Sequence, residues 1–103
     1  VVGTHTHVPT ADARILPQGT AYQTDLGMTG DVNSVIGMEN DICVSRFKTA
    51  VPHKMTAARG QGSLNGLIVE VSIDTGLAVD VVPLVYKSFF DKGLPMKMPS
   101  NPR

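Results

Sequence analysis

The chain has 103 residues, 42% of them hydrophobic and 17% charged, and its nine basic residues balance nine acidic ones. A length of this order corresponds to one domain at the small end of the usual range. A formal net charge of zero gives no general attraction for duplex nucleic acid or an anionic membrane, so an anionic ligand would need a local site.

The sequence carries a single cysteine, Cys43, which excludes an intrachain disulfide framework and fits a cytoplasmic protein. No apolar run approaches the roughly 20 residues that cross a bilayer, and no signal-peptide pattern opens the chain. We therefore expect a cytoplasmic location and no membrane partner. The chain opens on Val1-Val2-Gly3, two β-branched residues that run directly into a polar motif. We interpret this start as the end of a strand whose beginning is missing.

Short strands and loops are predicted for the first third of the chain. Residues 14–16 and 20–24 are β-forming segments on either side of a Pro-Gln-Gly turn signal, which predicts an antiparallel pair. Residues 31–37 are predicted to be partly helical, with Asp31 as the N-cap and Gly37 as the stop.

A helix and a hairpin are expected in the later part of the chain. The apolar spacing over residues 39–47 fits a short helix or a strand, and we favour the helix. Residues 66–73 and 77–85 are dense in β-branched residues and predict a hairpin with a three-residue loop at 74–76. Residues 87–103 hold three prolines and little periodicity, which predicts an irregular or disordered tail.

His5 and His7 form the one reactive-looking cluster of the sequence. In a loop that follows a glycine, two histidines at this spacing can converge on adjacent ions, and imidazole suits first-row transition metals. Two ligands are too few for a closed site, so other residues would have to complete it. On spacing alone, a hydrogen-bonded turn pair remains the simpler alternative.

The longer string VVGTHTHVPTAD at residues 1–12 resembles the last metal-binding motif of the calcineurin-like metallophosphoesterases. It is most similar to the YmdB-type branch, which consists of bacterial phosphodiesterases that act on cyclic nucleotides. The resemblance continues through further segments as far as about residue 85: 15–22, 24–30, residue 31, 34–38, 46–47 and the predicted hairpin.

The resemblance implies an α/β (α+β) sandwich of two mixed sheets flanked by helices. Residues 1–86 would be the C-terminal part of that single domain, mostly β with a C-terminal hairpin, and 87–103 its tail. The missing N-terminal part of the same domain would then be the main structural partner. Without it, unpaired strand edges and an exposed apolar face would favour association, and homo-oligomerisation is left open.

For the site, the resemblance implies that His5 ligates one and His7 the other of two divalent or trivalent transition-metal ions, with Fe or Mn expected. The other ligands and the general acid would come from segments outside these residues, so no catalytic residue is assigned in this chain. Asp12 and Asp25 occupy matching positions and are expected to orient the loop or the histidines. Turn capping is the alternative role for both carboxylates.

The implied activity is hydrolysis of a small phosphodiester, with a cyclic nucleotide expected, by attack of a hydroxide held between two ions. The 103 residues alone are expected to be inactive. Whether the substrate would be a 2′,3′- or a 3′,5′-cyclic nucleotide is left open. One alternative is a non-catalytic β-rich binding or assembly module. Another is a small β-rich protein that binds one metal ion through His5 and His7.

Overall fold

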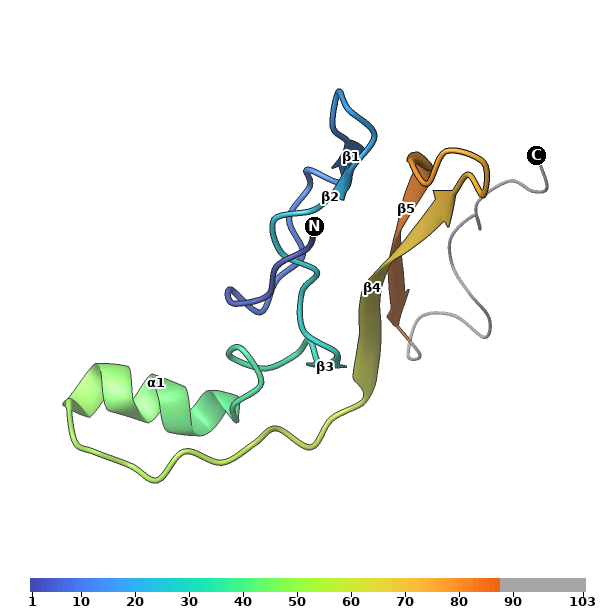
Figure 1. Ribbon diagram of the computed structural model, residues 1–103. Coiled ribbons are helices and arrows are strands. Elements are labelled where there is room, and N and C mark those ends of the chain that lie inside the picture. The colour runs from blue at the N-terminus through green and yellow to red at the C-terminus, as the bar shows by residue number, and fades with distance from the viewer. Residues whose placement is uncertain (88–103) are drawn as a thin grey trace.

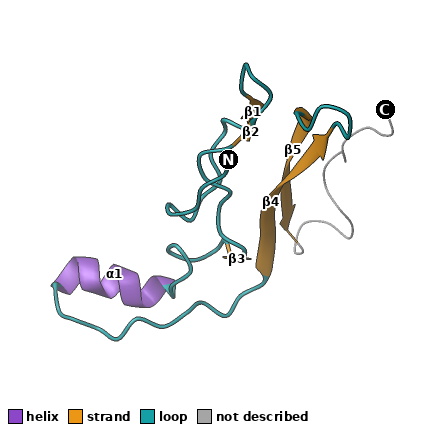
Figure 2. Ribbon diagram, in the orientation of Figure 1, coloured by secondary structure: helices purple, strands orange, loops and turns teal. Residues whose placement is uncertain are grey.

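The computed structural model describes residues 1–87. Most of its regular structure consists of strands, with one helix and long loops among them (Figure 2). In chain order the elements are β1 (Arg14–Ile15), β2 (Ala21–Tyr22), β3 (Gly30–Asp31), α1 (Asn40–Thr49), β4 (Gly62–Val71) and β5 (Ala78–Lys87). The predicted β-rich character with a C-terminal hairpin is therefore confirmed.

The longest regular structure is the antiparallel hairpin of β4 and β5, at one end of the molecule (Figure 1). Pairs of β-branched residues face each other across it, as in Val69 opposite Val81 and Ile68 opposite Val82. Such cross-strand pairs pack well on a pleated surface and stabilise a sheet. β3 adds a short third strand against β4, which gives the order β3-β4-β5.

The hairpin differs from the prediction at its ends. β4 begins four residues earlier than expected, at Gly62, and the loop between the paired strands spans residues 72–77 instead of 74–76. Ser72 closes this loop, since its N–H donates to the Leu77 carbonyl at 2.9 Å and its own carbonyl accepts from Gly76 at 2.8 Å. Lys87 is the last residue of β5, and the predicted tail beyond it lies outside the described residues.

The predicted antiparallel pair near the N-terminus is present as β1 and β2. Arg14 pairs with Tyr22 and Ile15 with Ala21, and the Arg14 guanidinium lies 5.1 Å from the centre of the Tyr22 ring. The turn between these strands contacts the start of β5, where the Ala78 N–H donates to the Gly19 carbonyl at 2.9 Å. This hydrogen bond between Ala78 and Gly19 thus joins the β1-β2 sheet to the β3-β4-β5 sheet.

The preferred helix over residues 39–47 is confirmed as α1, which extends two residues further. It ends where Ala50 takes a left-handed conformation with φ of 55° and its N–H donates to the Arg46 carbonyl at 2.9 Å. A left-handed residue after the last helical turn is a common helix end. Figure 1 shows that α1 and the return segment 50–61 extend away from the β4–β5 hairpin.

The prediction of partial helix over residues 31–37 is wrong. Asp31 ends β3, and its carboxylate accepts the N–H of Asn33 at 2.8 Å, so it caps a turn and not a helix. Val35 and Met38 then exchange two backbone hydrogen bonds across Ile36 and Gly37, whose φ values are 46° and 96°. Positive φ at both central residues is typical of a tight hairpin turn, and Gly37 serves that turn.

Among residues 1–86, Cys43 is the only buried apolar residue, with 6% exposed, and the other buried residues are Gln23, Asp25 and Ser63. Large apolar side chains such as Phe47 and Ile73 are 88% and 100% exposed. These residues do not enclose a core of their own, and the complete two-sheet sandwich and the expected association stay predictions.

None of the helices formed by residues 1–87 combines the length and the apolar character that a membrane span requires.

Candidate metal centre

The two histidines lie on a loop of residues 3–9, called the histidine loop below. The loop is fixed at both ends to residues 23–26. At its start, the Leu26 N–H donates to the Gly3 carbonyl at 2.9 Å, and just past its end the Thr10 N–H donates to the Asp25 carbonyl at 3.0 Å. A Cβ at Gly3 would lie 2.4 Å from the Thr24 carbonyl oxygen, so this close approach requires glycine.

The carboxylate of Asp25 lies beneath the histidine loop and is almost fully buried, with 2% of the residue exposed. One of its oxygens, Oδ2, accepts the backbone N–H groups of His5 at 2.8 Å and Thr6 at 2.6 Å, together with the Thr6 hydroxyl at 2.9 Å. The other, Oδ1, accepts the Gly27 N–H at 2.8 Å. These contacts join the Asp25 carboxylate to the backbone of the histidine loop and to Gly27.

The same hydrogen bonds change the acidity of this carboxyl group. Donation from the Thr6 backbone N–H, followed by that of Gly27, lowers the pKa of Asp25 from the ordinary 3.8 to about 2, against the opposing effect of desolvation. Donors stabilise the charged form, so the group remains a carboxylate at neutral pH. Because its oxygens face the loop backbone, Asp25 supports the histidine loop from below.

Asp12 forms a second carboxylate support, one layer further from the histidines. It accepts the Thr10 hydroxyl at 2.6 Å, the Thr24 N–H at 3.1 Å and the Thr24 hydroxyl. The hydroxyls of Thr10 and Thr24 are the largest causes that lower the pKa of Asp12 to about 2. The Thr10 hydroxyl also accepts the Asp25 N–H at 2.9 Å, so Asp12 orders the segment that carries Asp25.

His7 contacts a segment that is distant in the sequence. Its Nδ1 lies 2.9 Å from the carbonyl oxygen of Ile36. A carbonyl only accepts, so Nδ1 carries the proton of this hydrogen bond and the lone pair of a neutral ring is at Nε2. His7 itself has a left-handed backbone with φ of 70°, which is uncommon for a residue other than glycine.

Both imidazoles are exposed and line one shallow concavity of about 270 Å³, together with Thr4, Gly27 and Met28. Imidazole nitrogen is a suitable ligand for first-row transition metals. Among residues 1–87, however, no group of three or more His, Cys, Asp or Glu side chains could hold a metal ion. Residues 1–87 could therefore offer two imidazole ligands to a metal ion, and they do not form a complete donor set by themselves.

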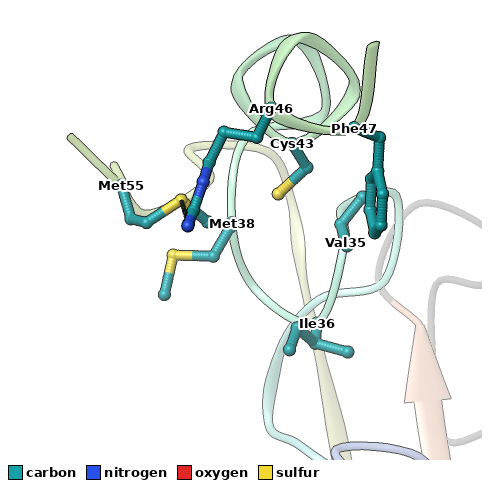
Figure 3. Close-up of a pocket in the computed structure, with 7 residues that line it drawn as sticks. All are labelled: Val35, Ile36, Met38, Cys43, Arg46, Phe47 and Met55. Atoms are coloured by element: carbon teal, nitrogen blue, oxygen red, sulfur yellow. Dashed lines mark hydrogen bonds between the residues drawn. The ribbon is translucent and has the colours of Figure 1, made fainter. Parts of the chain in front are cut away.

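A second, apolar cavity of about 400 Å³ lies between α1 and the turn at residues 35–38 (Figure 3). In this view Cys43 and Phe47 point from the helix toward the turn, and Arg46 reaches Met55, whose sulfur accepts from Nη1 at 3.2 Å. Ile36 is one of the residues that line this cavity, and its carbonyl contacts His7. The third histidine, His53, lies in the return segment 50–61 and lines neither cavity.

Sequence comparison shows the family to which the chain belongs. Residues 1–84 match the YmdB-like protein family, and the chain belongs to that family. It is 49% identical over 81 residues to a Bacillus subtilis protein named 2′,3′-cyclic-nucleotide 2′-phosphodiesterase. It is 41% identical over 76 residues to a Mycoplasma pneumoniae protein whose printed name is "Putative phosphatase/phosphodiesterase". These matches cover 79% and 73% of the chain.

The chain spans less than a third of the length of these relatives, 31% and 27% respectively. Two solved structures are similar to it over 84% of its length. One is a hypothetical protein from Thermus thermophilus, with 44% identity and a TM-score of 0.70 over 33% of that chain. The other is a novel phosphatase from Mycoplasma pneumoniae, with 36% identity and a TM-score of 0.73 over 32% of that chain.

Proposed function

We propose that the complete protein containing these residues is a metal-dependent phosphodiesterase, and that His5 and His7 are two of the ligands of its dinuclear metal centre. The observation that carries the proposal is the arrangement of the histidine loop. It presents two exposed imidazoles to one concavity in a chain that belongs to the YmdB-like family. Two transition-metal ions, with Fe or Mn expected, would polarise the phosphoryl group and provide a nucleophile at neutral pH.

The roles of this chain's own residues follow from their contacts. His5 and His7 supply neutral nitrogen ligands, and the proton on Nδ1 of His7 leaves Nε2 available. Asp25 keeps the backbone between the histidines in place through the N–H groups of His5 and Thr6. Its carboxylate accepts four hydrogen bonds, so its function is to orient the loop and not to bind a metal ion. The general acid and the remaining ligands belong to segments outside these residues.

The proposed substrate is a small cyclic nucleotide. The support comes from the printed name of the Bacillus subtilis relative, a 2′,3′-cyclic-nucleotide 2′-phosphodiesterase with 49% identity. A cyclic nucleotide is a small anion, and a local metal centre can attract it despite the zero net charge of the chain. We extend the proposal to a cytoplasmic enzyme that acts on neither membranes nor duplex nucleic acid.

The test is a hydrolysis assay on the protein expressed from its complete reading frame, with 2′,3′-cyclic AMP and 3′,5′-cyclic AMP as alternative substrates and Mn²⁺ or Fe²⁺ added. We expect hydrolysis of the 2′,3′ isomer. His5→Ala and His7→Ala should each reduce kcat/KM by at least about 100-fold, because each removes a ligand that positions the substrate for reaction.

His53→Ala is the matched control, because the same side chain is removed from a position outside the histidine loop. It should retain the activity of the unaltered protein. Equal activity of the His5→Ala and His7→Ala variants and the control would contradict the proposal. Preference for the 3′,5′ isomer would retain the metal centre and the cyclic-nucleotide class but overturn the expectation of the 2′,3′ isomer, and hydrolysis of neither isomer would overturn the proposed substrate.

A further inference from the structure

The contact between His7 and Ile36 joins two loops that are 29 residues apart in the chain. Both ends of the contact have a left-handed backbone, with φ of 70° at His7 and 46° at Ile36. A β-branched residue rarely adopts this conformation, and it persists only where the surroundings impose it. The Ile36 side chain is 53% exposed, so its own burial does not account for the conformation.

The surroundings that impose this conformation are hydrogen bonds to the turn. The Ser34 hydroxyl donates to the Asp31 carbonyl and accepts the Gly37 N–H at 2.9 Å. On the other side, the Gly37 carbonyl accepts the Ala58 N–H at 2.8 Å. The turn is therefore held between the end of β3 and the return segment that follows α1.

We propose that the turn of residues 34–38 is a positioning element for His7: the Ile36 carbonyl accepts from Nδ1 and thereby directs Nε2 toward the metal ion. The inference rests on the proposed function, since it assigns His7 to a metal centre. Because a main-chain carbonyl orients the His7 ring, the identity of the side chain at position 36 matters less for this orientation than the shape of the turn. Ile36 is a positioning residue, and it does not contact the ion or the substrate.

A fixed hydrogen-bond acceptor at one ring nitrogen affects how well a histidine binds metal through the other. A histidine whose second nitrogen donates to a fixed acceptor has one tautomer and one ring orientation, and loss of such an acceptor costs about 10–100-fold in metal affinity. The turn also lines the apolar cavity beneath α1 (Figure 3). The helix and the return segment thus contribute to the metal centre through the backbone of the turn.

The first test is the ring ¹⁵N spectrum of His7 in the metal-free protein from the complete reading frame, assigned with His7→Gln. We expect the Nδ1–H tautomer, with a pyridine-type shift at Nε2. The Ser34→Ala variant removes both hydrogen bonds of the hydroxyl and should lose this preference. Its metal dissociation constant should rise about 10–100-fold.

Two further variants distinguish loss of the contact with the Ile36 carbonyl from a general loss of stability. Ser72→Ala makes the same change in the distant β4–β5 loop, and Ile36→Asn keeps the carbonyl on a residue that tolerates a left-handed backbone; both should keep the tautomer and the metal affinity. An Nε2–H tautomer in the unaltered protein would overturn the inference, as would unchanged metal affinity in Ser34→Ala or loss of the tautomer in Ile36→Asn. A protein that has the tautomer but binds no metal would instead overturn the proposed function.

Discussion

The histidine loop and the β4–β5 hairpin are stabilised in different ways. The hairpin is a backbone ladder in which ten-residue strands pair directly, and the residues that define it are neighbours in the sequence. The histidine loop has little regular structure, and its N–H groups donate to a carboxylate at Asp25, about 20 residues later. A change of one side chain should therefore alter the loop strongly and the hairpin weakly.

Among the changes that compare these two regions, Asp25→Asn has the largest expected effect. The amide has one acceptor oxygen, whereas the carboxylate accepts donors at both oxygens. In one orientation the NH₂ group faces the N–H groups of His5 and Thr6, and in the other it faces the N–H of Gly27. We expect the affinity for metal in the protein from the complete reading frame to fall about 10–100-fold, measured by equilibrium dialysis with Mn²⁺.

The control for this substitution is Asp74→Asn, which makes the same change in the exposed loop between β4 and β5. It should leave the metal affinity unchanged. If Asp25→Asn bound metal as tightly as this control, the carboxylate would not be what holds the histidine loop.

A second comparison uses two glycines with a left-handed backbone. Gly27, beside the histidine loop, has φ of 89°, and a Cβ there would lie 2.8 Å from Cδ of Pro9. Gly76, in the hairpin loop, has φ of 73° and open space around that position. Gly76→Ala should cost about 1–2 kcal/mol for the backbone alone, and Gly27→Ala about 2–4 kcal/mol because the overlap with Pro9 adds to it.

Urea unfolding of the two variants measures this difference directly. A greater loss of stability in Gly76→Ala than in Gly27→Ala would contradict the close packing of the histidine loop against Pro9.

Acid should release the histidine loop before it separates the hairpin, since the loop depends on a carboxylate. The pKa of Asp25 is lowered from 3.8 to about 2 on folding. A lowered folded pKa contributes stability that is fully present above the unfolded value and is lost as the pH falls, here between about pH 4 and pH 2. The backbone ¹H–¹⁵N signals of His5, Thr6 and Gly27 should shift in this range, ahead of those of β4 and β5. Loop signals that titrate near 3.8 would contradict the stabilised carboxylate.

The same contrast explains which features the sequence could predict. The hairpin and the β1–β2 pair follow local patterns of β-branched residues and turn signals, and both are present at nearly the expected places. The prediction of a helix at Asp31 and Gly37 is wrong because a helix cap and a glycine stop have the same local signature as an Asx turn and a tight hairpin turn.

The contact between His7 and Ile36 had no local signal. It joins residues 29 positions apart through a main-chain carbonyl, and a carbonyl is present at every position of any sequence. The sequence shows only that the β-branched Ile36 precedes Gly37. This pair becomes informative only once the φ of Ile36 is known. The support of the histidine loop by Asp25 could be anticipated only through the family resemblance.

The most direct test of the account is the metal content of the protein expressed from its complete reading frame, measured by mass spectrometry beside the His5→Ala/His7→Ala double variant and His53→Ala. The account predicts two transition-metal ions per chain in the unaltered protein and in His53→Ala, with loss of bound metal in the double variant. Equal metal content in all three proteins would contradict the assignment of the histidine loop to the metal centre.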